Sequence, residues 1–381
     1  MRILITTDLF TVITNGVVTS VKNLYDELKH LGHDVRILTL SENAHSYKDG
    51  DVTYIRSMPL PVYPDVRMPT SYHHRLIKEF VDWRPDIIHS QCEFFTYQFA
   101  LYISKRTGAP IVHTYHTLYE QYATYVIPNK RLGIYAVRSL SKKRLKGAKR
   151  IVVPTRKIEN TLLGYKINQQ ISIIPSGIDL SRHGVKISAS ERSLMRQKHG
   201  ISDDEFLIVY LGRLGIEKNL DEVIKYFAKA TSLYSKIRLM IVGGGPAIEH
   251  LKKLADEVCH NEAIVFAGMV DPSDVPKYYQ LGDLFVSAST SETQGLTYVE
   301  ACANGLPLLC RQDECLDDII TNGENGYTYE TEEEFIRYLG VIYQDAEWRR
   351  EASEKSRKTA EQFSKQSFGK ALEEVYTEII R

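Results

Sequence analysis

Hydrophobic and polar positions follow two alternating patterns from the first residue onward. Short β-branched and aliphatic runs, such as residues 3–5 and 35–40, predict strands. The segment between these two runs has a helical spacing of apolar residues, at Val17, Val21, Leu24, Leu28 and Leu31. Because strands and helices alternate in this way, the pattern predicts a parallel sheet with helices on both faces.

The same alternation restarts in the second half of the chain. Strand-like runs there are separated by helical stretches at 220–234 and 247–258, and they begin near Phe206, Ile237, Ile264, Leu284 and Leu306. A polar segment with proline and glycine, residues 175–184, separates the two sets. The sequence therefore predicts an α/β protein with two doubly wound domains, residues 1–178 and 179–362, and a helical tail after them.

Composition narrows the class of protein. With 381 residues, 43% hydrophobic and 25% charged, the chain is typical of a globular protein, which excludes collagen-like and disordered classes. Five cysteines without a C-x-x-C pair support neither a disulfide framework nor a zinc ribbon, which favours a cytoplasmic setting. No apolar run approaches about 18 residues and no secretion signal is apparent, so we expect no membrane-spanning segment.

Charge is distributed unevenly although the formal net charge is zero. Residues 1–185 carry 25 Lys and Arg against 15 Asp and Glu, and the remainder carries 23 against 33. The first half is therefore net +10 and the second net −10. A cationic half attracts nucleic acid or an anionic membrane surface, so the imbalance indicates a charged partner without identifying it.

Two motifs in the first half lie where ligands of open α/β sheets bind. Gly16 follows the first predicted strand at the start of a helix, whose N–H groups suit an anion, although an ordinary turn glycine explains it equally well. His113 and His116 lie at the end of another predicted strand. Residues three apart on a strand point to opposite faces, so the two histidines are not expected to share a metal. One of the two histidines can face a ligand. The alternative is an ordinary hydrogen-bonded histidine at the end of the strand.

Glycine-rich loops follow two strands of the second half. Arg213 and Lys218 bracket one loop and suit a diphosphate, although a pair of surface cations is the plain alternative. Glycines 243–245 predict a tight turn that lets a bulky group lie against the backbone. The full G-x-G-x-x-G spacing and its distal acidic residue are missing, so a nicotinamide dinucleotide site is not predicted.

The most specific motif spans residues 291–307. Glu292 is predicted in a loop and Glu300 one to two turns into a helix that begins near Gly295. Backbone amides between the two glutamates suit an anion, and the two carboxylates suit sugar or ribose hydroxyls. The alternative is that one glutamate caps the helix and the other is a solvated helix side chain. The D-x-D at 49–51 is interpreted as a turn, so no metal is expected, and cationic side chains must neutralise a leaving diphosphate.

Taken together, these ordered motifs resemble the family-4 retaining glycosyltransferases of the GT-B architecture, in which two Rossmann-like domains face a central cleft. The resemblance implies that Arg213 and Lys218 contact the donor diphosphate and Glu300 the ribose. It further implies that the helix at about 363–381 packs back on the first domain.

The resemblance also implies the catalytic residues. They would be His116, beside the anomeric carbon, and Glu292, on the transferred sugar. The remaining donor contacts would be Gly16 and the amides of Gln294, Gly295, Leu296 and Thr297. No metal and no cofactor are implied, since the nucleotide sugar is a substrate.

The segment 119–150 is strongly basic, with nine Lys and Arg against Glu120. If it is helical, one face carries Arg131, Arg138, Lys142, Lys146 and Lys149. Such a stripe suits anionic lipid headgroups, whereas a solvated helix face is the plain alternative. Nucleic acid is not expected as a partner, because no nucleic-acid-binding module accompanies the stripe.

Within the family, residues 113–122 and 291–298 look like those of bacterial 1,2-diacylglycerol 3-glucosyltransferases. That resemblance implies transfer of glucose from UDP-glucose to a lipid acceptor at the inner face of the plasma membrane, with Tyr119 near the lipid entry. The alternatives are another UDP-hexose, a glucosylated lipid or a soluble sugar as acceptor. A nucleotide-sugar epimerase and a non-catalytic binding protein on the same architecture also remain open.

Overall fold

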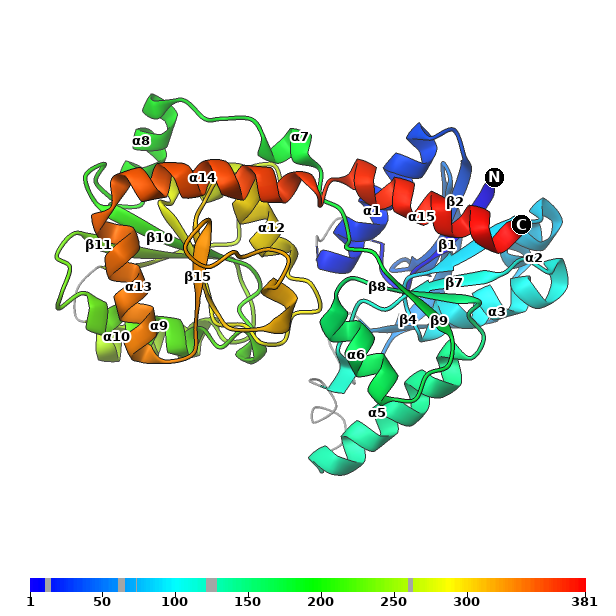
Figure 1. The fold of residues 1–381 in the computed structure, drawn as a ribbon. Coiled ribbons are helices and arrows are strands. Elements are labelled where there is room, and N and C mark those ends of the chain that lie inside the picture. Colours follow the sequence, from blue (N-terminus) through cyan, green and yellow to red (C-terminus); the bar gives the residue numbers. More distant parts are fainter. Residues whose placement is uncertain (11–14, 61–65, 73, 121–128, 260–262) are drawn as a thin grey trace. The chain divides into compact units, whose positions relative to one another are not determined.

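The computed structural model describes residues 1–10, 15–60, 66–72, 74–120, 129–259 and 263–381. These residues form two compact units (Figure 1). Unit 1 comprises Met1–Gly177 with Lys365–Arg381, and unit 2 comprises Ile178–Ser364. Each unit is a twisted, mainly parallel sheet with helices on both faces, so the predicted α/β class is confirmed.

The sheet of unit 1 runs in the order β3-β4-β2-β1-β6-β7-β8-β9, and β5 pairs with β4. The first strand, β1, has β2 on one side and β6 on the other, both parallel to it. The strand order of the sheet therefore reverses between β1 and β6. Ligands of open α/β sheets bind beside such a reversal, at the carboxyl ends of the strands. The strands are β1 (Arg2–Thr6), β2 (Asp34–Ser41), β3 (Tyr47–Asp49), β4 (Val52–Pro59), β5 (Arg67–Pro69), β6 (Ile87–Ser90), β7 (Ile111–Thr114), β8 (Arg150–Val153) and β9 (Gln170–Ile173).

Helices cover both faces of this sheet. On one face, α1 (Gly16–His30) and the last helix, α15 (Lys365–Ile380), pack with β1 and β2 in a cluster that includes Ile5, Leu24 and Leu372. The opposite face buries Phe80, Ile103 and Leu162 from three other helices. These helices are α2 (Arg75–Trp83), α3 (Phe95–Thr107) and α6 (Arg156–Gly164), and α5 (Lys130–Leu145) adds Leu145.

The sheet of unit 2 is parallel throughout its described strands and runs in the order β12-β11-β10-β13-β14-β15. By position along the chain this is the 3-2-1-4-5-6 order of doubly wound nucleotide-binding sheets. The strand order of this sheet reverses between β10 and β13, and we call this position the reversal point of unit 2. The strands are β10 (Phe206–Leu211), β11 (Ile237–Val242), β12 (Ile264–Gly268), β13 (Leu284–Ser287), β14 (Leu308–Arg311) and β15 (Gly326–Tyr329).

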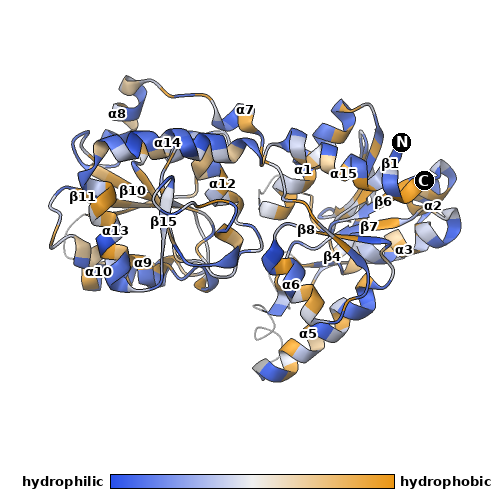
Figure 2. Ribbon diagram, in the orientation of Figure 1, coloured by the Kyte–Doolittle hydropathy of each residue, from blue (hydrophilic) through white to orange (hydrophobic). Residues whose placement is uncertain are grey.

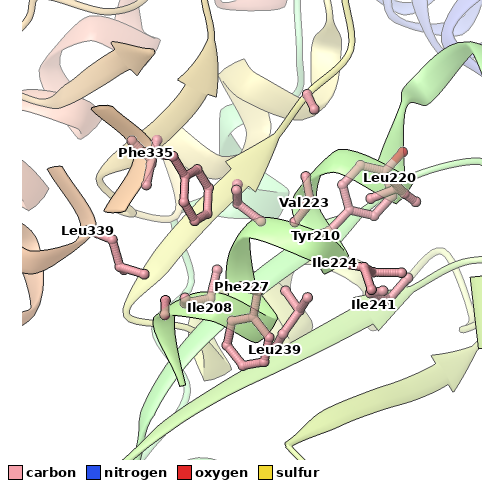
Figure 3. Close-up of a cluster of buried hydrophobic side chains, with 14 of the residues drawn as sticks. Ile208, Tyr210, Leu220, Val223, Ile224, Phe227, Leu239, Ile241, Phe335 and Leu339 are labelled. Carbon is pink, nitrogen blue, oxygen red and sulfur yellow. The ribbon is translucent and has the colours of Figure 1, made fainter. Parts of the chain in front are cut away.

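Alternate residues of these strands build two cores. Ile208 and Tyr210 of β10 pack on one face with Phe227 and Phe335, as Figure 3 shows. Their neighbours Leu207 and Val209 face the other side, as the period of a strand requires. The first face is covered by α9 (Leu220–Ala230), α10 (Ile248–Val258) and α13 (Glu332–Gln344). The second is covered by α8 (Ala189–Lys198), α11 (Val275–Leu281), α12 (Leu296–Ala303) and α14 (Ala346–Glu361), with α7 (Leu180–His183) preceding α8.

The glycine turn after β11 packs against the chain itself. A Cβ on Gly243 would lie 2.0 Å from the carbonyl oxygen of Gly212, and one on Gly245 would lie 2.5 Å from that of Leu214. The amide of Leu214 donates to the carbonyl of Gly244 at 2.9 Å. The bulky group expected against this turn is therefore the 212–214 backbone, and the turn holds the loop that carries Arg213.

Candidate functional site

The reversal point of unit 2 brings two sequence-predicted residues into direct contact. Lys218 ends the short 3-10 helix η1 (Ile216–Lys218) after β10, and Glu292 lies in the loop after β13. Their side chains meet at 2.5 Å, Nζ to Oε1. The hydroxyl of Ser289 donates to the same carboxylate oxygen at 3.0 Å. Because β10 and β13 are neighbours, residues 74 positions apart share one site.

A second ion pair lies in the loop after β10. Nη1 of Arg213 is 2.8 Å from Oε1 of Glu217, whose side chain is only 10% exposed against 44% for the arginine. The hydroxyl of Ser291 donates to the backbone carbonyl of Glu217 at 3.1 Å and so ties the loop after β13 to this one. We refer to Arg213, Glu217, Lys218 and Glu292 as the charge quartet. Its two positive and two negative charges cancel.

Helix α12 begins at the same edge of the sheet. Gly295 precedes it with φ +74°, and a Cβ there would lie 2.3 Å from the ring of Tyr298. Glycine is therefore required at this turn on two counts, its backbone conformation and the space available. Gln294 is buried before it, and Leu296 and Thr297 form the first turn, whose amides precede any helical acceptor. Such a turn can bind an anion through its N–H groups.

Glu300 lies in the second turn of α12 and has a different partner. Its Oε2 accepts a hydrogen bond from the hydroxyl of Tyr279, on α11, at 2.9 Å. Burial raises the pKa of Glu300 to about 7, although the Tyr279 hydrogen bond and the charge of Arg182 act in the opposite direction. The carboxyl group is therefore close to half ionised at neutral pH. The ionised form is purely an acceptor, whereas the protonated form has an O–H donor and less acceptor capacity.

In unit 1, His116 lies two residues beyond β7 and contacts Gln91, the residue that follows β6. Nε2 of the histidine is 2.7 Å from Oε1 of the glutamine. Burial and the neighbouring His113 lower the pKa of His116 to about 3, so its imidazole is neutral at physiological pH. With the glutamine oxygen as acceptor, the proton of the neutral ring is on Nε2.

His113 belongs to a separate buried group. Its Nε2 lies 3.1 Å from Oε1 of Glu93, and the other oxygen of that carboxylate accepts from the hydroxyl of Tyr119 at 2.5 Å. Burial and the negative charge of Glu93 raise the pKa of Tyr119 well above its ordinary value. The two histidines thus have different partners. Tyr119 is held by a carboxylate rather than presented as a free hydroxyl.

Gly16 opens helix α1, and its neighbour Asn15 caps that helix. The side-chain oxygen of Asn15 accepts from the amide of Val18 at 2.9 Å. Residues 11–14, which lead into this turn, lie outside the described part of the chain. The first turn of α1 therefore begins with a standard polar cap and an exposed glycine.

The basic stripe is carried partly by α5 and partly by the turn after it. Arg131, Arg138 and Lys142 are exposed on the helix, whereas Lys146 is its C-terminal cap and Lys149 lies between the helix and β8. The predicted single helical face therefore ends before Lys149, because α5 stops at Leu145. Arg138 pairs with Glu120 at 2.9 Å and lies over the ring of Tyr165.

Apolar side chains accompany the cations on the amino-terminal half of α5. Leu132 and Tyr135 are 61% and 72% exposed, and because they are three positions apart they are neighbours on the helix surface. Figure 1 shows this half of the helix projecting from unit 1, and Figure 2 shows hydrophilic and hydrophobic residues interleaved along it. The carboxyl-terminal half is anchored by Ser141 and Leu145, which are buried.

Sequence reasoning missed several polar residues at these strand ends. Gln91 and Glu93 follow β6, and Asp8 follows β1, so the strand-end rule that singled out His116 also applies to them. Asp8 accepts from the amide of Thr96 at 2.7 Å, and burial raises its pKa. Tyr279 carries no local signal, because its contact with Glu300 arises only from helix packing.

Neither a metal-binding cluster nor a membrane-spanning helix occurs among the described residues. No group of three or more His, Cys, Asp or Glu there could hold a metal ion. Asp51, of the D-x-D turn, pairs with Lys29 at 2.8 Å. No helix in the described ranges is both long enough and apolar enough to cross a membrane.

Comparison with known proteins assigns family relationships to both halves. Residues 14–182 match the family described as Glycosyltransferase Family 4, and residues 191–359 match Glycosyl transferases group 1. The chain is 31% identical to an alpha-monoglucosyldiacylglycerol synthase of Streptococcus pneumoniae, over 100% of this chain and 86% of that protein. It is also 31% identical to the synthase of the same name from Acholeplasma laidlawii, over 100% and 98% of the two chains.

Solved structures share the fold at lower identity. Anabaena HepE in complex with UDP superposes with a TM-score of 0.77 at 16% identity, covering 99% of this chain and 100% of that one. Sucrose-phosphate synthase from Thermosynechococcus elongatus gives 0.78 at 18% identity, covering 99% and 98%. The expected GT-B class of two doubly wound domains is thereby confirmed.

Proposed function

Because the chain belongs to glycosyltransferase family 4, we propose that it transfers glucose from UDP-glucose to the 3-hydroxyl of 1,2-diacylglycerol and retains the anomeric configuration. The product is alpha-monoglucosyldiacylglycerol. The observation that carries this proposal is 31% identity, along the whole chain, to two synthases named for that lipid. A relative of the same fold was solved in complex with UDP, which supports a uridine nucleotide as the donor.

The donor is assigned to the reversal point of unit 2. Arg213 and Lys218 supply positive charge for the diphosphate, and the amides from Gln294 to Thr297 complete its cradle. Glu300 accepts the ribose hydroxyls, supported by the Tyr279 hydrogen bond that favours its ionised form. Glu292, whose carboxylate Lys218 and Ser289 hold in place, accepts hydroxyls of the transferred sugar. The family resemblance adds Gly16, at the exposed start of α1, as a further donor contact.

In the proposed reaction the bond between the anomeric carbon and the diphosphate oxygen breaks, and its electron pair leaves with UDP. The acceptor oxygen bonds to the same face of the sugar, and its proton passes to the departing diphosphate. Arg213 and Lys218 stabilise the charge that develops on the leaving group, an effect of about 3 kcal/mol for one well-placed donor. A neutral His116 offers a hydrogen-bonding dipole to the oxocarbenium-like sugar rather than a positive charge. These groups need no metal ion in the scheme.

Helix α5 is assigned to the anionic membrane surface, so the enzyme is peripheral on the inner face of the plasma membrane. Exposed Arg131, Lys142, Lys146 and Lys149 each contribute about 1 kcal/mol near such a surface. Leu132 and Tyr135 can enter the headgroup region between them. Arg138 is already paired with Glu120, so its share is expected to be smaller. The family resemblance assigns Tyr119 to the lipid entry, where its ring rather than its hydroxyl would face the lipid, because Glu93 holds the hydroxyl.

The test is transfer from radiolabelled UDP-glucose to diacylglycerol in anionic mixed micelles. We expect a monoglucosylated lipid as product, and severe loss of turnover in Glu292→Gln and His116→Ala with unchanged circular dichroism. Glu205→Gln is the matched control, because Glu205 pairs with Arg238 before β10, at the opposite end of that strand. Transfer only to a soluble sugar, or conversion of UDP-glucose without any acceptor, would replace the proposal with a soluble-acceptor transferase or an epimerase.

A further inference from the structure

The loop after β10 is built around the carboxylate of Glu217. A Cβ on Gly215 would lie 2.2 and 2.3 Å from the two carboxylate oxygens, so the missing side chain at 215 admits this group. The amide of Lys218 donates to the carbonyl of Gly215 at 3.1 Å and closes the turn. Glu217 is thereby held 2.8 Å from Arg213 while it is only 10% exposed.

This arrangement places a negative charge beside the cations that bind the diphosphate. The charge quartet is neutral without a ligand, and a bound nucleoside diphosphate adds at least two negative charges to it. Like charges a few ångströms apart repel each other, and the repulsion is stronger where protein atoms exclude water from one of them, as they do for Glu217. Since Glu217 shares a short loop with Arg213 and Lys218, it stays close to the bound phosphates.

Glu217 could help binding only by orienting Arg213. The side chain of Arg213 is 44% exposed, and ion pairs of exposed groups contribute little, so the gain from orientation is small. Repulsion between a mostly buried carboxylate and an incoming diphosphate is the larger effect. The balance therefore favours competition for Arg213 over assistance.

We propose that Glu217 is an internal counter-ion that the donor diphosphate must displace from Arg213, and that it sets the affinity for the nucleotide. The same carboxylate pairs with Arg213 again as the UDP product departs, which promotes release. Glu217 is thus a residue that determines affinity without contacting the transferred sugar. The inference rests on the proposed function, because that function assigns the diphosphate to Arg213 and Lys218.

Calorimetric titration of the full chain with UDP and with uridine tests the inference. Glu217→Gln keeps the shape of the side chain and removes its charge, and it should bind UDP 3- to 10-fold more tightly than the wild type. Uridine, which has no phosphate, should bind both proteins equally. Glu205→Gln, which removes a carboxylate paired with Arg238 at the other end of β10, should leave UDP affinity unchanged. UDP should also inhibit turnover of Glu217→Gln more strongly than that of the wild type, by the same factor, whereas Glu205→Gln should be inhibited like the wild type.

Unchanged or weaker UDP binding by a folded Glu217→Gln protein would overturn the inference. If that variant does not fold, Glu217→Asp withdraws the charge by one methylene and should tighten UDP by a smaller factor; no tightening would again overturn it. Arg213→Ala separates this inference from the donor site itself. It should weaken UDP at least 10-fold and abolish the effect of Glu217→Gln. If Arg213→Ala leaves UDP affinity unchanged, the assignment of the diphosphate to Arg213 is wrong, and the inference falls with it.

Discussion

The hydroxyl of Tyr279 donates a hydrogen bond to Oε2 of Glu300 across 2.9 Å, from one helix of unit 2 to the next. This bond favours the ionised carboxylate, yet burial has the larger effect and raises the pKa of Glu300 to about 7. The protein thus keeps a carboxyl group where ionisation is costly, at the position assigned to the ribose. Functional sites commonly retain such unfavourable groups at the expense of stability.

Glu300→Gln should therefore stabilise the protein in alkaline solution. The pKa of Glu300 rises from 4.5 to about 7 on folding, so its contribution to stability is fully present below pH 4.5 and is lost as pH rises through 7. At pH 8 the ionised group costs about 3 kcal/mol relative to a neutral isostere. Urea unfolding followed by Trp348 fluorescence, in a Trp83→Phe background, should show this gain at pH 8 and almost none at pH 4. An equal gain at both pH values would contradict the burial of the charge.

Donor binding should become weaker as the pH falls through the pKa of Glu300. Protonation of Glu300 removes an acceptor for ribose hydroxyls, so UDP affinity should fall as pH decreases from 8 to 6. Glu300→Gln corrects for titration of the phosphate itself, because the phosphate titrates in both proteins. Tyr279→Phe removes a bond to the ionised form, so the midpoint of the wild-type decline should move to higher pH. Calorimetry across this range measures the difference, and parallel pH profiles for wild type and Glu300→Gln would exclude a role for Glu300.

His116 should remain neutral and fixed as one tautomer between pH 5 and 8. Its pKa is about 3 because of burial and His113, and Gln91 accepts its Nε2 proton at 2.7 Å. Gln91→Leu leaves that N–H without its acceptor and should cost about 1 to 3 kcal/mol of stability. Gln91→Glu places a negative charge there and should raise the pKa of His116. Proton–nitrogen NMR of the histidine rings measures both effects, and a wild-type His116 that titrates near pH 6.5 would contradict the assignment.

Gly243→Ala should be far more damaging than Gly200→Ala, although both glycines have positive φ, +132° and +68°. At Gly200 a Cβ meets nothing within 4 Å, so only backbone strain of about 1 kcal/mol is expected. At Gly243 it would lie 2.0 Å from the carbonyl oxygen of Gly212, so the Arg213 loop must move. We expect a loss of more than about 3 kcal/mol and reduced UDP affinity. Similar urea midpoints for the two variants would contradict the close packing of these loops.

Membrane binding by α5 should have two separable components. Lys142→Gln should weaken binding to vesicles rich in phosphatidylglycerol by about fivefold at low salt, because one lysine near an anionic surface contributes about 1 kcal/mol. At high salt the same substitution should have little effect, since salt screens the charge. Leu132→Ser should weaken binding at both salt concentrations, because it removes apolar contact. Leu163→Ser is the control, since Leu163 is 55% exposed on α6 of the same unit. Sedimentation with vesicles measures all three, and equal losses for Leu132→Ser and Leu163→Ser would contradict a docking role for α5.

Much of the architecture could be predicted from local pattern. The alternation of strand-like and helical spacing indicated two doubly wound halves, and the spacing of Glu292 and Glu300 placed one in a loop and the other inside a helix. Both inferences depend only on periodicities of two and 3.6 residues, which act over a few positions. The place where α5 ends before Lys149 was not predicted, because helical spacing alone does not say where a helix stops.

The sequence by itself therefore determined the type of each element and the strand end at which each candidate residue lies. Tertiary structure alone decided the partners. Lys218 meets Glu292 because β13, three strands later in the chain, lies beside β10, and Tyr279 reaches Glu300 because α11 packs beside α12. Local periodicity carries no information on strand order or helix packing, since these depend on how whole faces bury apolar area together.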